Sequence, residues 1–568
     1  MDKNIPTPLK SVTRDKGGTI TRLFDRATTR LQAAQRELLL DILKRNRATE
    51  YGKEHFFSRL SDATAFTRAV PVNTFSDLAP YVQKMKEGRR DILTSGKLCR
   101  FNLTSGTTDE PKYVPVSRTG MTREAAATIQ WLYRALRDHP SFLDHSVLCV
   151  TGALVEGSTP CGVPCGSASG MLYRSLRSLS PRSFALPPVL SEIKDYALRY
   201  FLTARLALEK EVSFVVTPSP ATLVRIAEVG IRHQQEIVRS IHDGVLARWE
   251  SFDRSREDSG VLRALCAGVE PNPQRARVLD RVIGRHGRLR PGECWKRLRL
   301  IGCWLGGSIG FQADRLSEHF GDDVARRDIG YRTSEGSFTI PHRDHSPGGI
   351  LAVRDHYFEF IPASEADRLS KRILGCHELE QGKQYRIIVT NYNGLYRYDM
   401  NDVVEVQDFY NQTPIIAFAR KGADVLNIAG EKLHANHFLK AFEILKERFN
   451  LVAVQFRVAP DCKELRCEVF LHVEPEPSRD FLLGTVLPFL DRSLAEANIE
   501  YEGKRRSGRL NAPCLHVMDA SWEEESRRSF LAAGHRDIQY KWRTVVEKAS
   551  ALDRRHVRFT VKGREEPR

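Results

Sequence analysis

The 568-residue sequence has none of the features that mark a membrane-bound or secreted protein. Its apolar runs, such as residues 214–217 and 386–390, are far shorter than the roughly 20 residues that cross a bilayer. The first residues, 1–22, alternate charged with turn-forming residues and contain no apolar stretch of a secretory signal. We therefore expect a cytoplasmic protein without a membrane partner.

Paired cysteines, which would indicate a zinc site or a disulfide framework, are also missing. The 11 cysteines are scattered along the chain. Cys161 and Cys165 lie close together, but no second pair follows them at the spacing of metal ligands. An odd number of scattered cysteines is typical of reduced thiols in a cytosolic protein, so we expect no zinc site.

Basic residues outnumber acidic ones, 87 to 71, which gives a formal net charge of +16. Such a charge attracts nucleic acids and other anions. The basic residues are spread along the chain, and the denser groups at 285–290, 296–299 and 504–509 have the composition of solvated loops. We therefore expect no nucleic-acid partner and favour an enzyme that acts on anions such as ATP and carboxylates.

A loop rich in hydroxyl residues, TSGTTDEPK, occupies residues 104–112. It lacks the order G-x-x-x-x-G-K-[ST] of a Walker P-loop, which is absent from the whole sequence. A glycine lets successive N–H groups point at one anion, hydroxyls add donors and a lysine adds charge. The residues that supply these groups are Ser105, Gly106, Thr107, Thr108 and Lys112. The pattern suits the phosphates of ATP, although an ordinary surface turn has a similar composition.

A second motif, IGYRTSEG, spans residues 329–336. Gly330 and Gly336 flank a short turn that can place Tyr331 against a flat ring while Glu335 faces outward. A carboxylate beside a triphosphate is a usual ligand of Mg²⁺. The alternative is a helix cap in a surface turn, formed by Ser334 and Glu335.

Two further motifs follow toward the C-terminus. Residues 394–402, GLYRYDMND, lead into an apolar run at 403–406. An aspartate at a strand entrance, here Asp402, can accept the hydroxyls of a ribose, or it can close an ordinary hairpin. Residues 420–432 contain Gly422 among charged residues and could form a hinge.

The apolar pattern predicts an α/β fold in two parts. Residues 20–50 have helical spacing, whereas short runs at 147–151, 214–217 and 298–304 alternate with helical patterns, which indicates βα units and a largely parallel sheet. From 349 to 406 the strands follow one another more closely, as in antiparallel sheets. After Arg420 come a strand, a helix from Ala435 and two more strands, at 452–458 and 466–473. We predict domains at 1–420 and 421–568.

The four motifs, in this order and at these intervals, resemble those of the adenylate-forming enzymes. They are most similar to the acyl-acid amido synthetases, the auxin- and jasmonate-conjugating Gretchen Hagen family of plants, and to its bacterial branch. The resemblance covers most of the chain and includes residues 35–43, 49–52, 70–72, 87–88, 358–362, 380–385 and 539–541. It implies a large N-terminal ATP- and acyl-acid-binding domain with mixed β-sheets and helices, and a smaller, mobile α+β C-terminal domain.

The resemblance also implies a role for each motif residue. The phosphates of ATP would be bound by Ser105, Gly106, Thr107, Thr108 and Lys112. The adenine and α-phosphate would be lined by Tyr331, Thr333 and Ser334, while Glu335 would bind Mg²⁺ and Asp402 would bind the ribose. The domain junction would contain Arg420 and Lys432, and Lys541 would enter the nucleotide site. Of these, Lys541, Glu335 and Lys432 would be catalytic. By analogy, the acid pocket would involve Tyr133 and residues 171–173 and 304–307.

The activity implied is the ATP-dependent activation of a small carboxylic acid as an acyl-adenylate, followed by transfer to an amine such as an amino acid. ATP and Mg²⁺ are the expected cofactors, and we expect a monomer. Transfer to a thiol of coenzyme A or of a carrier protein is an alternative, as is a nonenzymatic binding protein on a decayed fold. One residue departs from the family: Asn401 stands where glycine is usual, and asparagine tolerates a positive φ.

Overall fold

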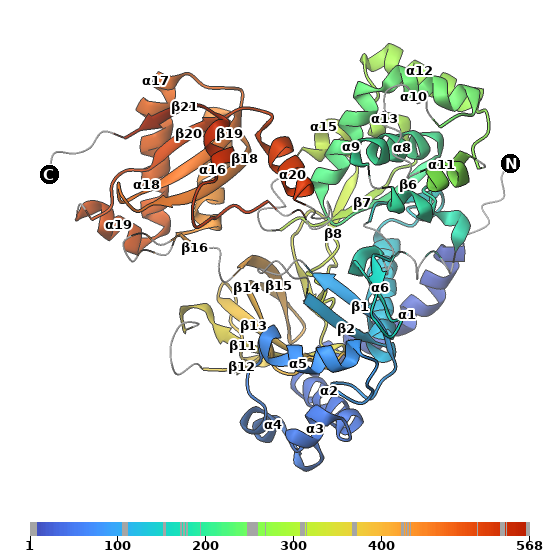
Figure 1. The fold of residues 1–568 in the computed structure, drawn as a ribbon, viewed down its shortest axis with the longest axis vertical. Coiled ribbons are helices and arrows are strands. Elements are labelled where there is room, and N and C mark those ends of the chain that lie inside the picture. Colours follow the sequence, from blue (N-terminus) through green and yellow to red (C-terminus); the bar gives the residue numbers. More distant parts are fainter. Residues whose placement is uncertain are drawn as a thin grey trace. The chain divides into compact units, whose positions relative to one another are not determined.

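The computed structural model describes residues 8–104, 112–151, 155–170, 173, 177, 180–193, 195–246, 259–266, 268–306, 313, 315–365, 372–421, 425–426, 428, 431, 433–507, 509–533, 540 and 542–563. The chain folds into two compact units (Figure 1). The N-terminal unit comprises Met1–Met400 and Val404–Phe418, and the C-terminal unit comprises Asn401–Val403 and Ala419–Arg568. Within the described ranges, no helix combines the length and the apolar character needed to cross a membrane.

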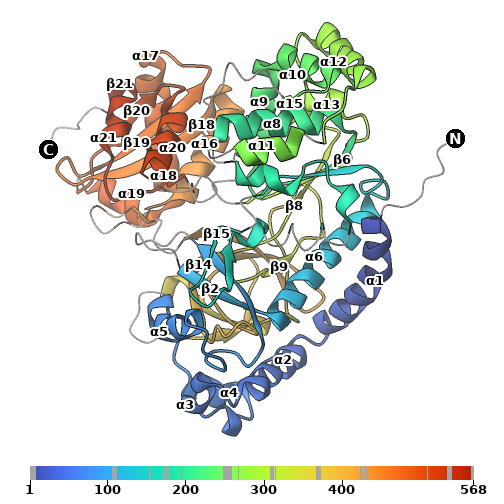
Figure 2. The same cartoon turned by 45° about the vertical axis from the view of Figure 1, so that its right-hand side comes forward.

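Helices open the N-terminal unit. They are α1 (Pro8–Thr28), α2 (Leu31–Asn46), α3 (Glu50–Glu54), α4 (Ala63–Ala69), α5 (Phe75–Lys86) and α6 (Arg118–Asp138). The single helix predicted for residues 20–50 is wrong, because the chain leaves the helical conformation at Arg30, where φ is −133°. The hydroxyls of Thr28 and Thr29 donate to carbonyls one turn back and compete with the helical hydrogen bonds. Figure 2 shows α1 lying beside α6.

A parallel sheet lies in the middle of this unit, as the alternating pattern predicts. Its strands, in the order β3-β6-β7-β8, are β3 (Ser146–Cys149), β6 (Val212–Val216), β7 (Leu300–Cys303) and β8 (Ala325–Asp328). All three neighbouring pairs are parallel, so the segments that follow β7 and β8 leave the same edge of the sheet. The accompanying helices are α8 (Tyr196–Glu209), α9 (Pro220–Arg232), α10 (Gln234–Asp243), α11 (Ser259–Cys266), α12 (Pro273–His286), α13 (Pro291–Cys294) and α15 (Leu316–Phe320).

A small sheet, in the order β2-β1-β5-β4, carries the hydroxyl-rich loop. Its strands are β1 (Leu98–Thr104), β2 (Lys112–Ser117), β4 (Gly157–Ser158) and β5 (Pro164–Gly166). Strands β1 and β2 are antiparallel, and Thr104 pairs with Lys112 at the end of the hairpin.

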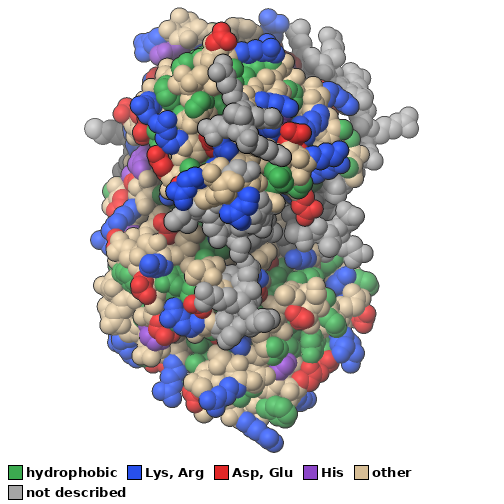
Figure 3. Space-filling view, turned by 90° about the vertical axis from the view of Figure 1, so that its left-hand side faces the viewer, with side chains coloured by type: hydrophobic (Ala, Val, Ile, Leu, Met, Phe, Trp, Pro, Cys, Tyr) green, Lys and Arg blue, Asp and Glu red, His purple; other side chains and the backbone are tan. Residues whose placement is uncertain are grey.

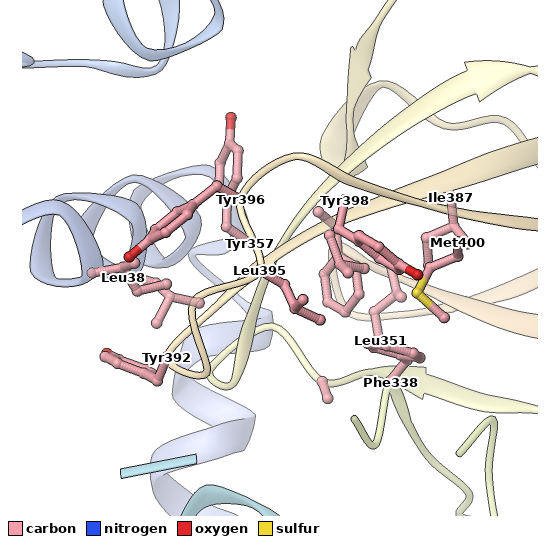
Figure 4. Packing of buried hydrophobic residues seen from close by; sticks show 14 of the residues in the cluster. Leu38, Phe338, Leu351, Tyr357, Ile387, Tyr392, Leu395, Tyr396, Tyr398 and Met400 are labelled. Carbon is pink, nitrogen blue, oxygen red and sulfur yellow. The ribbon is translucent and has the colours of Figure 1, made fainter. Parts of the chain in front are cut away.

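The closely spaced strands form a seven-stranded sheet in the order β12-β11-β13-β14-β15-β10-β9. They are β9 (Thr339–Ile340), β10 (Gly349–Leu351), β11 (His356–Pro362), β12 (Leu374–Gly375), β13 (Gln384–Asn391), β14 (Tyr398–Tyr410) and β15 (Thr413–Lys421). The pairs β11–β13, β11–β12, β10–β15 and β10–β9 are antiparallel, as predicted. Figure 4 shows Tyr398 and Met400 of β14 lying with Ile387 and Leu351 in the core of this unit.

The start of β14 corrects one expectation. Asp402 was expected at the entrance of a strand, but β14 already begins at Tyr398, so Asp402 lies within it. The strand starts early because Asp399 is fixed on two sides. Its carboxylate accepts a hydrogen bond of 2.8 Å from Arg386 Nε, and its N–H donates to the carbonyl of Asn73 at 2.8 Å.

The C-terminal unit has the α+β order that the sequence predicts. Its main sheet, in the order β18-β19-β20-β21, contains β18 (Val452–Asp461), β19 (Arg466–Glu474), β20 (Cys514–Met518) and β21 (Val557–Lys562), and β16 (Val425–Leu426) pairs with β17 (Leu433–His434). The helices are α16 (Ala435–Phe449), α17 (Arg479–Phe481), α18 (Leu487–Ala497), α19 (Ile499–Arg506), α20 (Trp522–Ala532) and α21 (Ala551–Arg555). The predicted helix start at Ala435 is confirmed.

On the face drawn in Figure 3, the charged side chains of the described residues do not form one basic stripe. On this face, Lys and Arg residues are dispersed among acidic and neutral ones. This distribution agrees with the interpretation that the excess of basic residues is spread over solvated faces.

Distant parts of the N-terminal unit are joined by two buried polar side chains. Gln35 of α2 donates to the carbonyls of Val353 and His356 at 2.8 Å each and accepts from the N–H of Phe358 at 2.9 Å. Arg397, at a φ of 43°, precedes β14. Its Nε lies 3.1 and 3.0 Å from the two carboxylate oxygens of Glu359 in β11.

The same guanidinium of Arg397 reaches the helical N-terminal segment. Its Nη1 donates to the carbonyls of Thr67 at 3.0 Å and Val70 at 2.8 Å. Arg397 and Glu359 are 4% and 2% exposed, so each charge depends on the other for compensation.

We predict that Arg397→Ala lowers the free energy of unfolding by about 3–5 kcal/mol, because it leaves the Glu359 carboxylate buried and unpaired. Chemical denaturation of the full chain, followed by circular dichroism, measures this change. Arg45→Ala is the matched control, since Arg45 forms an ion pair with Asp41 on the surface. The side chain of Arg45 is 53% exposed and that of Asp41 is 39% exposed. The control should change stability by less than about 1 kcal/mol. Equal effects of the two substitutions would contradict the role of the buried pair.

Candidate functional site

The motif at residues 329–336 forms a compact turn between β8 and β9. Thr333 donates its N–H to the carbonyl of Gly336 at 2.9 Å, and its hydroxyl accepts from the N–H of Glu335 at 3.1 Å. Gly330 has a φ of 94°, and a Cβ there would lie 2.7 Å from the carbonyl oxygen of Thr339. The turn therefore requires glycine at this position.

Tyr331 is held inside this turn. Its side chain is 7% exposed, and its ring centroid lies 5.1 Å from that of Phe338 and 5.8 Å from that of Phe418. Its N–H donates to the hydroxyl of Thr339 at 2.9 Å, and its carbonyl accepts from the N–H of Phe338 at 2.8 Å. These contacts fix a flat aromatic surface next to the peptide groups of the turn.

Two asparagines that the sequence did not single out attach the turn to neighbouring strands. Asn102 of β1 donates its amide to the carbonyl of Ser334 at 2.8 Å, and Asn391 of β13 donates to the carbonyl of Glu335 at 3.2 Å. The hydroxyl of Ser334 donates to the carbonyl of Leu103 at 3.2 Å. The sequence shows only that Asn102 and Asn391 are polar residues next to apolar runs. The fold shows that the side-chain amides of both reach the same turn.

The carboxylate of Glu335 remains available for a ligand. Its side chain is partly exposed, and its backbone is fixed at both the N–H and the carbonyl. Among the described residues, no hydrogen-bond donor or cation contacts its carboxylate. The described part of the chain also contains no group of three or more His, Cys, Asp or Glu side chains that could hold a metal ion alone. A cation at Glu335 would therefore take most of its ligands from a bound substrate and water.

A cavity of about 20 Å³ lies behind the turn. It is lined by Asn102, Val116, Gly120, Arg123, Glu124, Ala127, Ser334, Glu335, Gly336, Ser337, Asp355, His356, Asn391, Tyr392 and Asn393. This volume suffices for about one water molecule. Burial raises the pKa of Asp355 to about 6 and lowers the pKa of His356 to about 3, so this histidine is neutral at pH 7.

The hairpin that carries the hydroxyl-rich loop lies next to this turn, because Asn102 of β1 contacts Ser334. Lys112 begins β2, and its ammonium nitrogen lies 5.5 Å from the ring centroid of Phe75. Ser105, Gly106, Thr107 and Thr108 lie outside the described residues, as do Lys432 and Lys541.

Two predicted residues lie on the strands where the chain passes into the C-terminal unit. Asp402 is 1% exposed in β14, and Arg420 lies near the end of β15. Asn401 has a φ of 51°, so the expectation that it adopts the left-handed conformation is confirmed. One turn thus contains Tyr331, Thr333, Ser334 and Glu335. Asp402 and Arg420 lie outside this turn, in β14 and β15.

Of the residues expected at the acid pocket, Met171, Leu172 and Gly307 lie outside the described residues, and three of the others have identifiable contacts. Tyr133 of α6 packs against α1, where a Cβ on Gly17 would lie 2.5 Å from the Cβ of Tyr133. Tyr173 donates its hydroxyl to the carbonyl of Leu186 at 2.9 Å. Trp304, directly after β7, donates its indole N–H to the carbonyl of Gly330 at 3.0 Å. Of these three, Trp304 contacts the turn that contains Tyr331.

Comparison with protein-family models gives three matches along the chain. The GH3 family N-terminal domain matches residues 20–324, the GH3 family central domain matches 349–421, and the GH3 family C-terminal domain matches 436–550.

Two plant proteins are similar over most of their length. A jasmonoyl–L-amino acid synthetase of Nicotiana attenuata, JAR4, is 26% identical over 89% of this chain and 90% of its own. A putative indole-3-acetic acid-amido synthetase of Arabidopsis thaliana, GH3.9, is 24% identical over 76% of this chain and 77% of its own.

Solved structures share the fold. The acyl acid amido synthetase AtGH3.15, in complex with 2,4-DB, superposes with a TM-score of 0.83 at 18% identity over 98% of this chain and 99% of its own. A 2-hydroxyisobutyryl-CoA ligase in its postadenylation state has a TM-score of 0.51 at 12% identity over 91% of this chain and 89% of its own. The predicted α/β adenylate-forming fold is thereby confirmed.

We predict that Asn401→Ala lowers the free energy of unfolding by about 1–2 kcal/mol, because an alanine Cβ is strained in the left-handed conformation. Asn401→Gly should stay close to the natural protein, since glycine adopts a φ of 51° without strain. Asn450→Ala is the matched control, because Asn450 has a φ of 53° at the end of α16. Urea denaturation measures the free energy of unfolding of the three variants and of the natural protein. An Asn401→Ala protein as stable as the natural one would contradict a fixed left-handed residue here.

Proposed function

The chain belongs to the GH3 family of acyl acid amido synthetases, and from this premise we propose that it activates a small carboxylic acid with ATP and transfers the acyl group to an amine. Membership makes it a carbon–nitrogen ligase of the AMP-forming class that uses ATP. The observation that carries the proposal is the coverage of the chain by the three family domains, with Tyr331 and Glu335 fixed in one turn. An amino acid is the proposed amine.

The chemistry explains why ATP is needed. An amine cannot displace oxide from a carboxylate, because oxide is too poor a leaving group. Transfer of the adenylyl group to the acid makes AMP the leaving group and releases pyrophosphate. Negative charge then grows on the α-phosphate in the transition state, where fixed positive charge and hydrogen-bond donors lower the barrier.

We assign the nucleotide to the turn and the hairpin of the N-terminal unit. Tyr331 offers a fixed aromatic face for adenine, and Thr333 and Ser334 lie beside the α-phosphate. In the same assignment, Ser105, Gly106, Thr107, Thr108 and Lys112 bind the phosphates. Support comes from the contact between Asn102 of the hairpin and the carbonyl of Ser334 at 2.8 Å.

Glu335 fits a magnesium ligand, since no donor or cation among the described residues contacts its carboxylate and its backbone is held in place. Bound there, Mg²⁺ would supply positive charge close to the phosphates. We assign the ribose to Asp402, the domain junction to Arg420 and Lys432, and a phosphate-directed charge to Lys541. The C-terminal unit would swivel between adenylation and amide formation.

We predict that the purified protein, given ATP, Mg²⁺ and its acid, exchanges labelled pyrophosphate into ATP before an amine is added. A panel of carboxylic acids identifies the substrate, and amines are then added one at a time with AMP as the measured product. Coenzyme A in place of the amine is the comparison for thiol transfer. Amide formation with ADP and phosphate as products would exclude the adenylate route.

Glu335→Ala should reduce pyrophosphate exchange by about a hundredfold or more, the scale seen when a partner of transition-state charge is removed. The melting temperature should not change, because the carboxylate has no partner among the described residues. Glu37→Ala is the control, since Glu37 is 69% exposed and pairs with Arg30 on the surface. Near-normal exchange by the Glu335 variant would leave the metal assignment without support.

A further inference from the structure

A buried aspartate ends the strand that leads into the nucleotide turn. Asp328 is the last residue of β8 and is 4% exposed. One carboxylate oxygen accepts the N–H of Gly330 at 2.5 Å, and the other accepts the N–H of Leu305 at 2.8 Å. The backbone N–H of Gly348 also lowers the pKa of this side chain. One carboxylate therefore joins the loop after β7 to the loop after β8, and a third segment lies near it.

The loop after β8 contains the proposed adenine-binding turn, and the loop after β7 contains residues expected at the acid pocket. Gly330 immediately precedes Tyr331, and Leu305 follows Trp304 in the loop after β7. A second hydrogen bond, from the indole N–H of Trp304 to the carbonyl of Gly330 at 3.0 Å, joins the same two loops. Asp328 and Trp304 thus fix the loop after β7 against the loop after β8.

The third segment supports the first two. A Cβ on Gly306 would lie 3.2 Å from the Cβ of Pro347, so the loop after β7 packs against the residues before β10. Gly348, with a φ of 91°, follows Pro347 in this packing, and its N–H lowers the pKa of Asp328. The carboxylate is the shared acceptor of the loops after β7 and β8.

Only a carboxylate serves this position well. Aspartate presents two oxygens that accept on both sides, whereas asparagine would turn an N–H₂ group toward one of the backbone donors. Keeping a charge here has a cost, since burial raises the pKa of Asp328 to about 6 against the lowering effect of its backbone hydrogen bonds. The carboxyl group is therefore mostly ionised at pH 7, where it accepts on both sides.

We infer that Asp328 is a positioning residue of the adenylation reaction: it holds the Tyr331 turn and the loop at Trp304 in a fixed relation, so that nucleotide and acid meet correctly aligned. The inference rests on the proposed function, because it takes the two loops as the sites of ATP and of the acid. A misplacement of about 1 Å between reactants can lower the rate about a hundredfold.

The test is Asp328→Asn in the full chain. We expect kcat of pyrophosphate exchange to fall ten- to a hundredfold, while calorimetry still finds ATP bound at the natural stoichiometry with a Kd within about threefold. A merely structural role would instead lower the fraction of chains that bind ATP. An unchanged kcat, or a loss of kcat equal to the loss of binding sites, would overturn the inference.

Asp344→Asn is the matched control. Asp344 accepts a hydrogen bond of 2.7 Å from Arg327, the residue before Asp328, and its carboxylate bonds to neither loop. It should keep kcat within about twofold. A loss as large as that of Asp328→Asn would assign the effect to negative charge near β8 in general, and the inference would fall.

A second variant keeps the test decisive if Asp328→Asn does not fold. Trp304 is partly exposed, so Trp304→Phe should fold while losing the bond to the carbonyl of Gly330. We expect kcat to fall several-fold with ATP binding retained, and an unchanged kcat would overturn the inference. If the natural protein exchanges pyrophosphate and the variants do so with the same kcat, the inference alone is rejected. No exchange with any acid rejects the proposed function, and the inference with it.

Discussion

The buried ion pair between Arg397 and Glu359 is the constraint from which the geometry of the N-terminal unit follows. It fixes Arg397 in the left-handed conformation just before β14. The N–H of Arg397 donates to the hydroxyl of Thr390 at 2.8 Å, which holds the connection between β13 and β14. Asn391, the next residue, donates to the carbonyl of Glu335. The position of the proposed metal ligand thus depends on a charge pair in the core.

The candidate site is built mainly by side chains that bind backbone groups. Asn102 and Asn391 bind carbonyls of the turn, and Asp328 binds N–H groups at its start. Because neighbouring strands satisfy the peptide groups, the turn keeps its shape without using the carboxylate of Glu335. Such preorganisation keeps donors and charges in place at the moment of reaction.

The sequence predicts the features that depend on local pattern. The apolar runs predict the parallel sheet, the helix start at Ala435 is correct, and the departure at Asn401 predicts the positive φ that the structure has. The break between α1 and α2 was missed, because threonine hydroxyls compete with the helical hydrogen bonds while the apolar spacing continues.

Features that depend on long-range pairing could not be predicted from the sequence. Asp402 was placed at a strand entrance because the apolar run starts at Val403, whereas contacts of Asp399 with Arg386 and Asn73 start β14 earlier. Asp328, Asn102 and Asn391 become visible as site residues only when the fold brings β1, β8 and β13 to one turn.

The hydrogen bonds of Gln35 and Arg397 join residues that are more than 300 positions apart, which affects folding during synthesis. At roughly 5–20 residues per second, the partners of the first helices leave the ribosome some 15–65 s after those helices emerge. During this interval Gln35, Thr67 and Val70 lack the hydrogen-bond partners that they have in the folded unit, so the folding of this unit cannot be completed before β14 has been made.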